Sequence, residues 1–281
     1  MVAINTGVFQ VLPPAVEDVT SSLVGMGPLI TSIYGEATYS VPSGPTTGMA
    51  PCIASHLVEP TGRPVAGLVQ KGAFPSTRLL VTSSTNGGET WTTPVLIATI
   101  HDISGPFPPE KYRNLSLPAF ACDSRTGQLY LTWSDKGTRD ADILFSTSKD
   151  HGQTWSTPIR VNDDPLGNGA NQFQPQMAVA PDGVVSISFF DTRDDLHHQL
   201  IDVYLAQSVD HGTSFLKNLR VTTLSWDPTV DAPIDGYGSQ FIGDYQGLAV
   251  DDHFAHPFWN DTRTGAQEIF TAAIPSVQPY S

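Results

Sequence analysis

The chain is poor in cysteine and in positive charge. Its 281 residues include two cysteines, Cys52 and Cys122, which are too few for a disulfide framework or a zinc ribbon. They are interpreted as two buried thiols, with a single disulfide as the alternative. Lysine and arginine total 14 against 28 aspartates and glutamates, so the formal net charge is -14. Because phosphate binding needs a basic surface, this balance excludes nucleic acid as a partner.

Long apolar runs are missing as well. No stretch of about 18 apolar residues occurs, so we expect no membrane span. No basic segment followed by an apolar stretch begins the chain, so no signal peptide is visible, and either this is a mature form or upstream residues are missing. Little helical pattern is evident, whereas 24 glycines and 23 prolines indicate connections dominated by turns. An apolar fraction of 40% is enough for a sizeable core.

One eight-residue pattern occurs three times: Ser, any residue, Asp or Asn, any residue, Gly, any residue, Thr or Ser, and an aromatic residue. The copies begin at Ser84, Ser148 and Ser208, so their spacing is nearly constant. Asp or Asn in this pattern bonds its own backbone and closes a tight turn, while Gly supplies a positive φ. The aromatic ring is expected to pack under the turn. The pattern therefore predicts a hairpin and carries no chemistry itself.

The pattern resembles the Asp-box, or bacterial neuraminidase repeat, of the sialidase superfamily. The resemblance covers roughly residues 50–274 and implies an all-β fold, a β-propeller of four-stranded antiparallel blades. Each box would lie between the third and fourth strands of a blade. Short β-rich runs bounded by Gly, Pro and Asp fit four such units. Their expected inner strands are Pro51–Ser55, Leu117–Cys122, Pro175–Ala180 and Asp244–Val250.

We therefore interpret residues 1–281 as a single propeller domain. Residues 50–274 carry four clear repeats, and residues 1–49 form an irregular or partial blade or an insertion over one face. Five blades are expected, or six if the chain is incomplete. The last unit ends before a fourth strand. Val2–Asn5 is similar to the fourth-strand segments of other units and would close the ring; alternatively, it belongs to a blade cut off upstream.

An aromatic residue followed two positions later by aspartate, with a cation nearby, recurs where second strands end. The three copies are Trp133–Gly137, Phe189–Arg193 and Trp259–Arg263. Asp191 and Asp261, with the arginines of their copies, could bind a polar ligand, because a guanidinium can form two parallel hydrogen bonds with a carboxylate. Alternatively, each aspartate caps its turn and the arginine pairs with it across neighbouring blades.

The segment Gln240–Gly247 departs from the other units just ahead of an inner strand. Asp244 and Tyr245 would then point toward the mouth of the central channel. A tyrosine beside a carboxylate can serve as an activated nucleophile, and a carboxyl group as acid or base. The resemblance implies the same chemistry, because sialidases use a tyrosine nucleophile. The alternative is a buried tyrosine whose hydroxyl is satisfied by the aspartate.

The resemblance implies an exo-sialidase-like glycosidase that holds an acidic sugar with three arginines. Arg113, Arg193 and Arg263 are the residues loosely placed for this triad. The sequence departs from the family in lacking an Arg-Ile-Pro motif before the first box. We therefore expect an extracellular, secreted carbohydrate-active propeller that acts on an acidic glycan or glycoconjugate. The alternative is a non-catalytic module that binds a glycan or a protein.

No cofactor is expected, and no metal is assigned to the candidate site. One polar cluster could hold a structural divalent cation, because carboxylates and imidazoles are suitable ligands; it comprises Asp194, Asp195, His197, His198 and Asp202. A solvated polar loop is the alternative interpretation. The sequence leaves the oligomeric state unknown.

Overall fold

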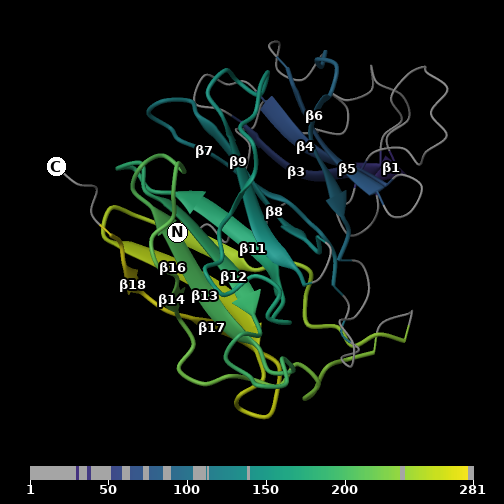
Figure 1. Ribbon diagram of the computed structural model, residues 1–281, viewed down its shortest axis with the longest axis vertical. Coiled ribbons are helices and arrows are strands. Elements are labelled where there is room, and N and C mark those ends of the chain that lie inside the picture. Colours follow the sequence, from purple (N-terminus) through teal and green to yellow (C-terminus); the bar gives the residue numbers. More distant parts are fainter. Residues whose placement is uncertain are drawn as a thin grey trace.

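The computed structural model shows that the short β-rich runs are strands joined by tight turns. It describes residues 30–31, 37–38, 52–58, 64–71, 76–84, 90–103, 112, 114–137, 140–234 and 238–277. These residues form four antiparallel sheets and no helix (Figure 1). Within these ranges, therefore, no helix is long and apolar enough to cross a membrane. The predicted all-β class is confirmed.

The second and third sheets are four-stranded meanders with the same order. The second contains β7 (Ala119–Cys122), β8 (Leu129–Asp135), β9 (Asp142–Ser148) and β10 (Ile159–Arg160). The third contains β11 (Gln172–Val179), β12 (Val185–Asp191), β13 (Asp202–Ser208) and β14 (Leu219–Arg220). In both sheets each strand pairs with its sequence neighbour, so the chain runs from one edge to the other.

The first and fourth sheets vary this plan. The first contains β1 (Ile30–Thr31), β2 (Ala37–Thr38), β3 (Cys52–Val58), β4 (Pro64–Lys71), β5 (Ser76–Ser83) and β6 (Val95–His101). The fourth contains β15 (Gly247–Val250), β16 (Phe254–Asp261), β17 (Glu268–Thr271) and β18 (Ile274–Pro275), which also pairs with β16. β17 and β18 pair with the same edge of β16, so no fourth strand lies outside β17 among the described residues. Val2–Asn5 lies outside the described residues, so ring closure stays a prediction.

The inner strands of the four sheets lie next to one another. β3 lies beside β7, β7 beside β11, and β11 beside β15. From these inner strands each sheet extends outward, and in the first sheet β1 and β2 are added on the other side of β3. This is the arrangement of a β-propeller, and the sheets are its blades. The predicted propeller of antiparallel four-stranded blades is confirmed, while its total blade number stays a prediction.

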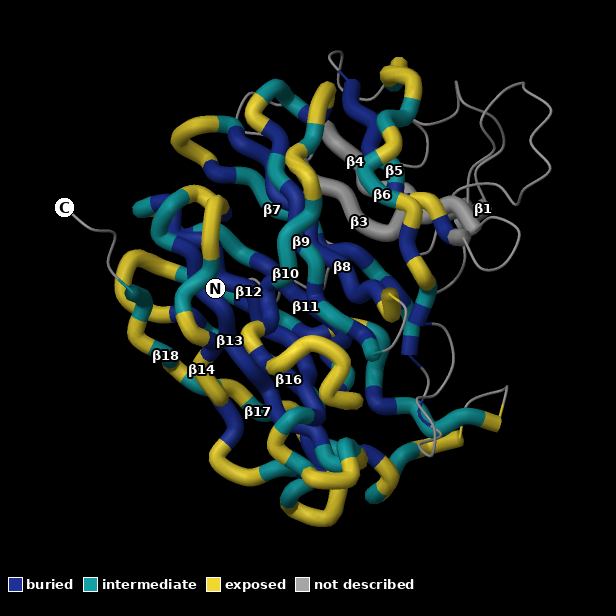
Figure 2. Tube along the Cα trace, in the orientation of Figure 1, coloured by how far each residue is buried: buried dark blue, intermediate teal, exposed yellow. Residues whose placement is uncertain are grey.

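Apolar side chains fill the spaces between adjacent blades. Tyr130 and Phe145 of the second blade pack against Ile187 and Phe189 of the third, and all four are buried. The rings of Tyr130 and Phe145 stack with their centroids 5.7 Å apart. Figure 2 shows the buried strands of the blades in dark blue, with exposed yellow loops around them. Burial of these faces supplies the main driving force that holds the blades together.

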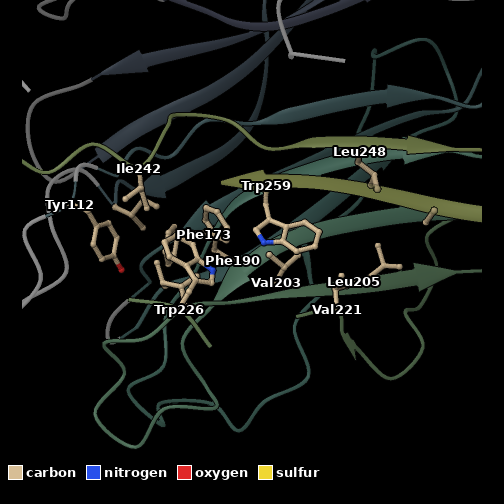
Figure 3. Packing of buried hydrophobic residues seen from close by; sticks show 14 residues of the cluster. Tyr112, Phe173, Phe190, Val203, Leu205, Val221, Trp226, Ile242, Leu248 and Trp259 are labelled. Atoms are coloured by element: carbon tan, nitrogen blue, oxygen red, sulfur yellow. The ribbon is translucent and has the colours of Figure 1, made fainter. Parts of the chain in front are cut away.

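A second aromatic cluster joins the third and fourth blades. Phe173, Phe190 and Trp226 lie close together, and Trp259 of β16 faces the same cluster (Figure 3). The ring of Tyr112, which precedes the second blade, stacks on Phe173 at 5.7 Å. Loops from distant parts of the chain therefore share this core. The Cys122 thiol is partly buried and donates to the Asp123 carbonyl at 3.5 Å, whereas the side chain of Cys52 lies outside the described part of the chain.

Two copies of the repeated pattern form the same turn between third and fourth strands. Ser148 donates to Asp150 Oδ1 at 2.8 Å, and the same oxygen accepts the Thr154 amide at 2.8 Å. Ser208 and Ser214 repeat these bonds to Asp210 at 2.7 and 2.9 Å. The predicted position and geometry of these two turns are confirmed. Most of the first copy lies outside the described residues.

The third-blade turn rests on the second blade. The ring of Phe215 packs edge-on against Phe145 of β9, with centroids 5.1 Å apart. Gly212 has φ +78°, and a Cβ added there would lie 2.6 Å from the Phe145 ring. Only glycine meets both conditions without strain, because it has no side chain and tolerates a positive φ.

We predict that Gly212→Ala lowers the free energy of unfolding by about 2–4 kcal/mol, because backbone strain and overpacking add. Gly137→Ala is the matched control, since Gly137 has φ +53° and no atom within 4 Å of an added Cβ. It should lose only about 1 kcal/mol from the unfavourable φ. Urea unfolding measures both variants, and equal losses would contradict packing of the turn against Phe145.

Candidate functional site

The predicted site residues gather at one end of the blades, here called the loop face. The loop face comprises the ends of the second strands and the starts of the inner strands. Antiparallel pairing brings them together: Gln172 of β11 pairs with Asp191 of β12, and Gly247 of β15 pairs with Phe258 of β16. The Ser-x-Asp turns lie at the opposite end, after the third strands. Arg113 lies outside the described residues.

Asp191 and Arg193 form a closed ion pair on the third blade. Asp191 is 0% exposed and accepts bonds from the Arg193 amide at 2.8 Å and from Arg193 Nε at 2.7 Å. Gln172 Nε2 donates to the same carboxylate at 3.1 Å. Burial raises the pKa of Asp191 to about 6, although Arg193 and Gln172 favour its ionised form.

The Arg193 guanidinium also reaches the second blade. Its Nη1 donates to Asp163, which follows β10, and its Nη2 approaches Asn218 Oδ1 at 3.3 Å. The guanidinium stacks over the Tyr204 ring, 4.3 Å from the ring centroid. Acids of two blades and an aromatic ring therefore contact this cation, whose side chain is 13% exposed. Arg193 thus pairs with the aspartate of its own blade and with an acid of the neighbouring blade that lies outside the repeated motif.

Asp261 and Arg263 repeat this arrangement on the fourth blade. Asp261 is 0% exposed and accepts the Arg263 amide and its Nε, each at 2.8 Å. The guanidinium lies over the Phe270 ring at 4.8 Å and donates to Thr223 beyond β14 at 3.3 Å. The described contacts thus join Arg193 and Arg263 to their own aspartates and to neighbouring loops.

The segment before β15 is different, because it presents a large exposed side chain. Tyr245 is 39% exposed, and Asp244 beside it is partly buried. Gln174 Nε2 of β11 donates to the Gly243 carbonyl at 2.8 Å, which holds this segment against the third blade. Gln174 itself has φ +49°, at a register shift in β11. The two inner strands therefore meet in an irregular stretch next to Tyr245.

Gln246 is a polar residue of the segment Gln240–Gly247 that the sequence pattern did not single out. It is 4% exposed, and neither atom of its amide has a hydrogen-bond partner among the described residues. The register places it where Pro118 and Pro175 stand in the second and third blades. This exchange of proline for glutamine is the signal that could have identified it. A buried amide can bind polar groups that enter the loop face.

The residues of the polar cluster are bound within the chain. Asp202 binds Arg220 Nη2 at 2.8 Å, and Asp194 accepts the Tyr204 hydroxyl at 2.7 Å. Asp195 Oδ2 accepts the Gln199 amide at 2.8 Å. Among the residues that the structure describes, no group of three or more His, Cys, Asp or Glu side chains is placed to hold a metal ion.

Comparison with known proteins supports the fold. No protein-family model matches the sequence, and no curated protein matches it. The solved Hadza microbial sialidase Hz136 superposes with a TM-score of 0.53 at 15% identity, over 86% of this chain and 52% of that one. A Penicillium chrysogenum alpha-L-arabinanase complexed with arabinobiose gives 0.50 at 13% identity, over 88% and 92%. A Dyadobacter fermentans protein of unknown function gives 0.51 at 15%, over 89% and 70%.

These identities are low, so the likeness concerns the fold alone. The chain spans about half the length of the sialidase. The successive antiparallel blades of this chain agree with the β-propeller fold that the comparisons indicate. What the chain binds must therefore be argued from its own side chains.

We predict that Asp191 makes stability fall as the pH rises. The pKa of Asp191 rises from 3.8 to about 6 on folding. Its contribution to the free energy of unfolding is therefore complete below about pH 4 and is lost as the pH rises through 6. Between pH 4 and 7, wild type should lose about 1–3 kcal/mol relative to Asp191→Asn. Urea unfolding at both pH values measures this, with exposed Asp252→Asn as control. A pH-independent difference between wild type and Asp191→Asn would contradict it.

Proposed function

We propose that this chain is a carbohydrate-active propeller that binds a glycan on the loop face, at Asp244 and Tyr245. The observation that carries the proposal is the combination at the start of β15. An exposed tyrosine, a partly buried aspartate and the buried Gln246 amide follow one another there. A sugar needs an apolar platform for its C–H face and polar groups for its hydroxyls, and this combination offers both.

The Tyr245 hydroxyl and the Asp244 carboxylate also suit glycoside hydrolysis. Tyr245 would attack the anomeric carbon, and Asp244 would accept the phenolic proton as a general base. The glycosidic bond would break as the leaving oxygen takes a proton from solvent or from the same carboxyl group. Water would then cleave the glycosyl–tyrosine bond, which releases the sugar and restores the tyrosine hydroxyl. This assignment extends the tyrosine-nucleophile chemistry that the sialidase resemblance implies. The structural similarity to a sialidase and to an arabinanase supports carbohydrate as the substrate class.

The arginines take a different place in this proposal. Asp191 and Asp261, both 0% exposed, already pair with Arg193 and Arg263, so a substrate carboxylate would compete with these ion pairs. Removing the partner of a buried carboxylate costs about 3–5 kcal/mol. We therefore assign these two pairs to ordering the loops around the ligand. Arg113 stays the proposed contact for an acidic sugar, and an extracellular location fits such a ligand.

A second candidate function is glycan binding without turnover. The ion pairs of Arg193 with Asp191 and of Arg263 with Asp261 favour it, because the implied sialidase triad needs arginines that face the substrate. Under this alternative Tyr245 and Asp244 bind the sugar and no covalent step follows.

We predict that Tyr245→Ala weakens binding to glycans on an array by roughly tenfold or more, because the aromatic platform is lost. Phe254→Ala is the matched control, since Phe254 is also 39% exposed and lies at the other end of the fourth blade. Its glycan affinity should match that of wild type. Unchanged binding by Tyr245→Ala, or equal losses in both variants, would remove the site from the loop face.

Turnover separates the two candidate functions. Release of reducing sugar from the glycans that bind is measured for wild type, Tyr245→Phe and Asp244→Asn. A hydrolase should lose at least about a hundredfold in rate in both variants. Tyr245→Phe keeps the ring, so it should retain glycan affinity. Binding without release by wild type would favour the non-catalytic module.

A further inference from the structure

An acidic residue opens the third strand of three blades and pairs with the aspartate that ends the second strand. The three pairs are Asp142 with Asp135, Asp202 with Asp191, and Glu268 with Asp261. Equal register means that these acids occupy one equivalent position. What each acid binds can therefore be compared directly between blades.

In the second and third blades the acid binds an arginine of the fourth strand. Arg160 Nε of β10 lies 2.5 Å from Asp142 Oδ1. Arg220 Nη2 of β14 lies 2.8 Å from Asp202 Oδ1. A guanidinium on a carboxylate is a strong and directional contact. The fourth strand is thus attached to each blade partly through this ion pair.

The next residue along the third strand is covered by the same fourth strand. Ile143 and Val203 are both 0% exposed. Their carbonyls accept the amides of Val161 and Val221, each at 2.8 Å. The two valines also pack in the clusters that contain Ile143 and Val203. An arginine followed by a valine therefore supplies one ion pair, one backbone hydrogen bond and one apolar side chain that packs on the third strand.

The fourth blade has the acid and the apolar residue but no such strand in the described part of the chain. Glu268 is exposed and accepts a bond from Thr264 Oγ1 at 2.7 Å. Ile269, the equivalent of Ile143 and Val203, is 73% exposed. No described strand pairs with the outer edge of β17. Open edges of this kind are templates for an added strand.

We propose that the outer edge of β17 docks an extended strand of a second polypeptide that carries arginine followed by valine. The arginine would pair with Glu268, and the valine would bond the Ile269 carbonyl and cover its side chain, as strand addition to a sheet edge requires. Residues 1–62 of this chain contain no lysine or arginine. Val2–Asn5 has Ala3 at the arginine position, so it lacks the charge that Glu268 selects.

The test uses a labelled peptide that copies residues 156–163, titrated against the full chain by fluorescence anisotropy. We expect saturable binding that weakens about tenfold or more for the Arg160→Ala peptide and for the Glu268→Gln protein. Asp252→Asn removes an equal charge at the other end of β16 and should bind like wild type. Glu268→Arg should abolish binding, and an Arg160→Glu peptide should restore it.

Three outcomes would overturn the proposal. The first is the absence of saturable binding to the full chain. The second is equal affinity for both peptides, or unchanged affinity in Glu268→Gln. The third is binding only after deletion of residues 1–5, which would show that this chain occupies its own edge. Urea unfolding of each variant checks that the fold is retained, and a loss of glycan binding by Tyr245→Ala leaves this test unaffected.

Discussion

A buried aspartate at the end of the second strand ties the loop face to the framework in three of the four blades. In three blades its Oδ1 accepts the backbone amide two residues later at 2.8 Å, and the donors are Gly137, Arg193 and Arg263. A buried carboxylate is unfavourable unless it is hydrogen-bonded, so this geometry holds the following turn in one conformation. The constraint recurs although the loop from β12 to β13 is longer than its counterparts after β8 and β16.

The same constraint links neighbouring blades. Asp135 also accepts the His101 amide of the first blade at 3.2 Å. Arg193 extends the contact of Asp191 to Asp163 of the second blade, and Arg263 extends that of Asp261 to Thr223. A cation held by two blades stabilises their relative position. The recurrence of the motif is thus explained by assembly of the propeller, and a ligand site needs features that do not recur.

Local signals predicted most of the fold, because turn chemistry and strand composition act over a few residues. The predicted inner strand Pro175–Ala180 begins earlier, at Gln172, because Gln172 and Phe173 pair with β12 across a register shift. Such a shift depends on the positive φ of Gln174, which composition does not reveal. The partners of Arg193 were equally hidden, because Asp163 meets it only after two blades have packed.

The start of the inner strand explains why one blade stands apart. Pro118 and Pro175 are buried at this position in the second and third blades, and proline offers neither an amide donor nor a polar side chain. In the fourth blade the same position holds Gln246, whose amide is buried without a partner among the described residues. The residue before it is the exposed Tyr245. Hydrogen-bonding capacity and an exposed ring thus coincide at one blade, where the repeat is broken.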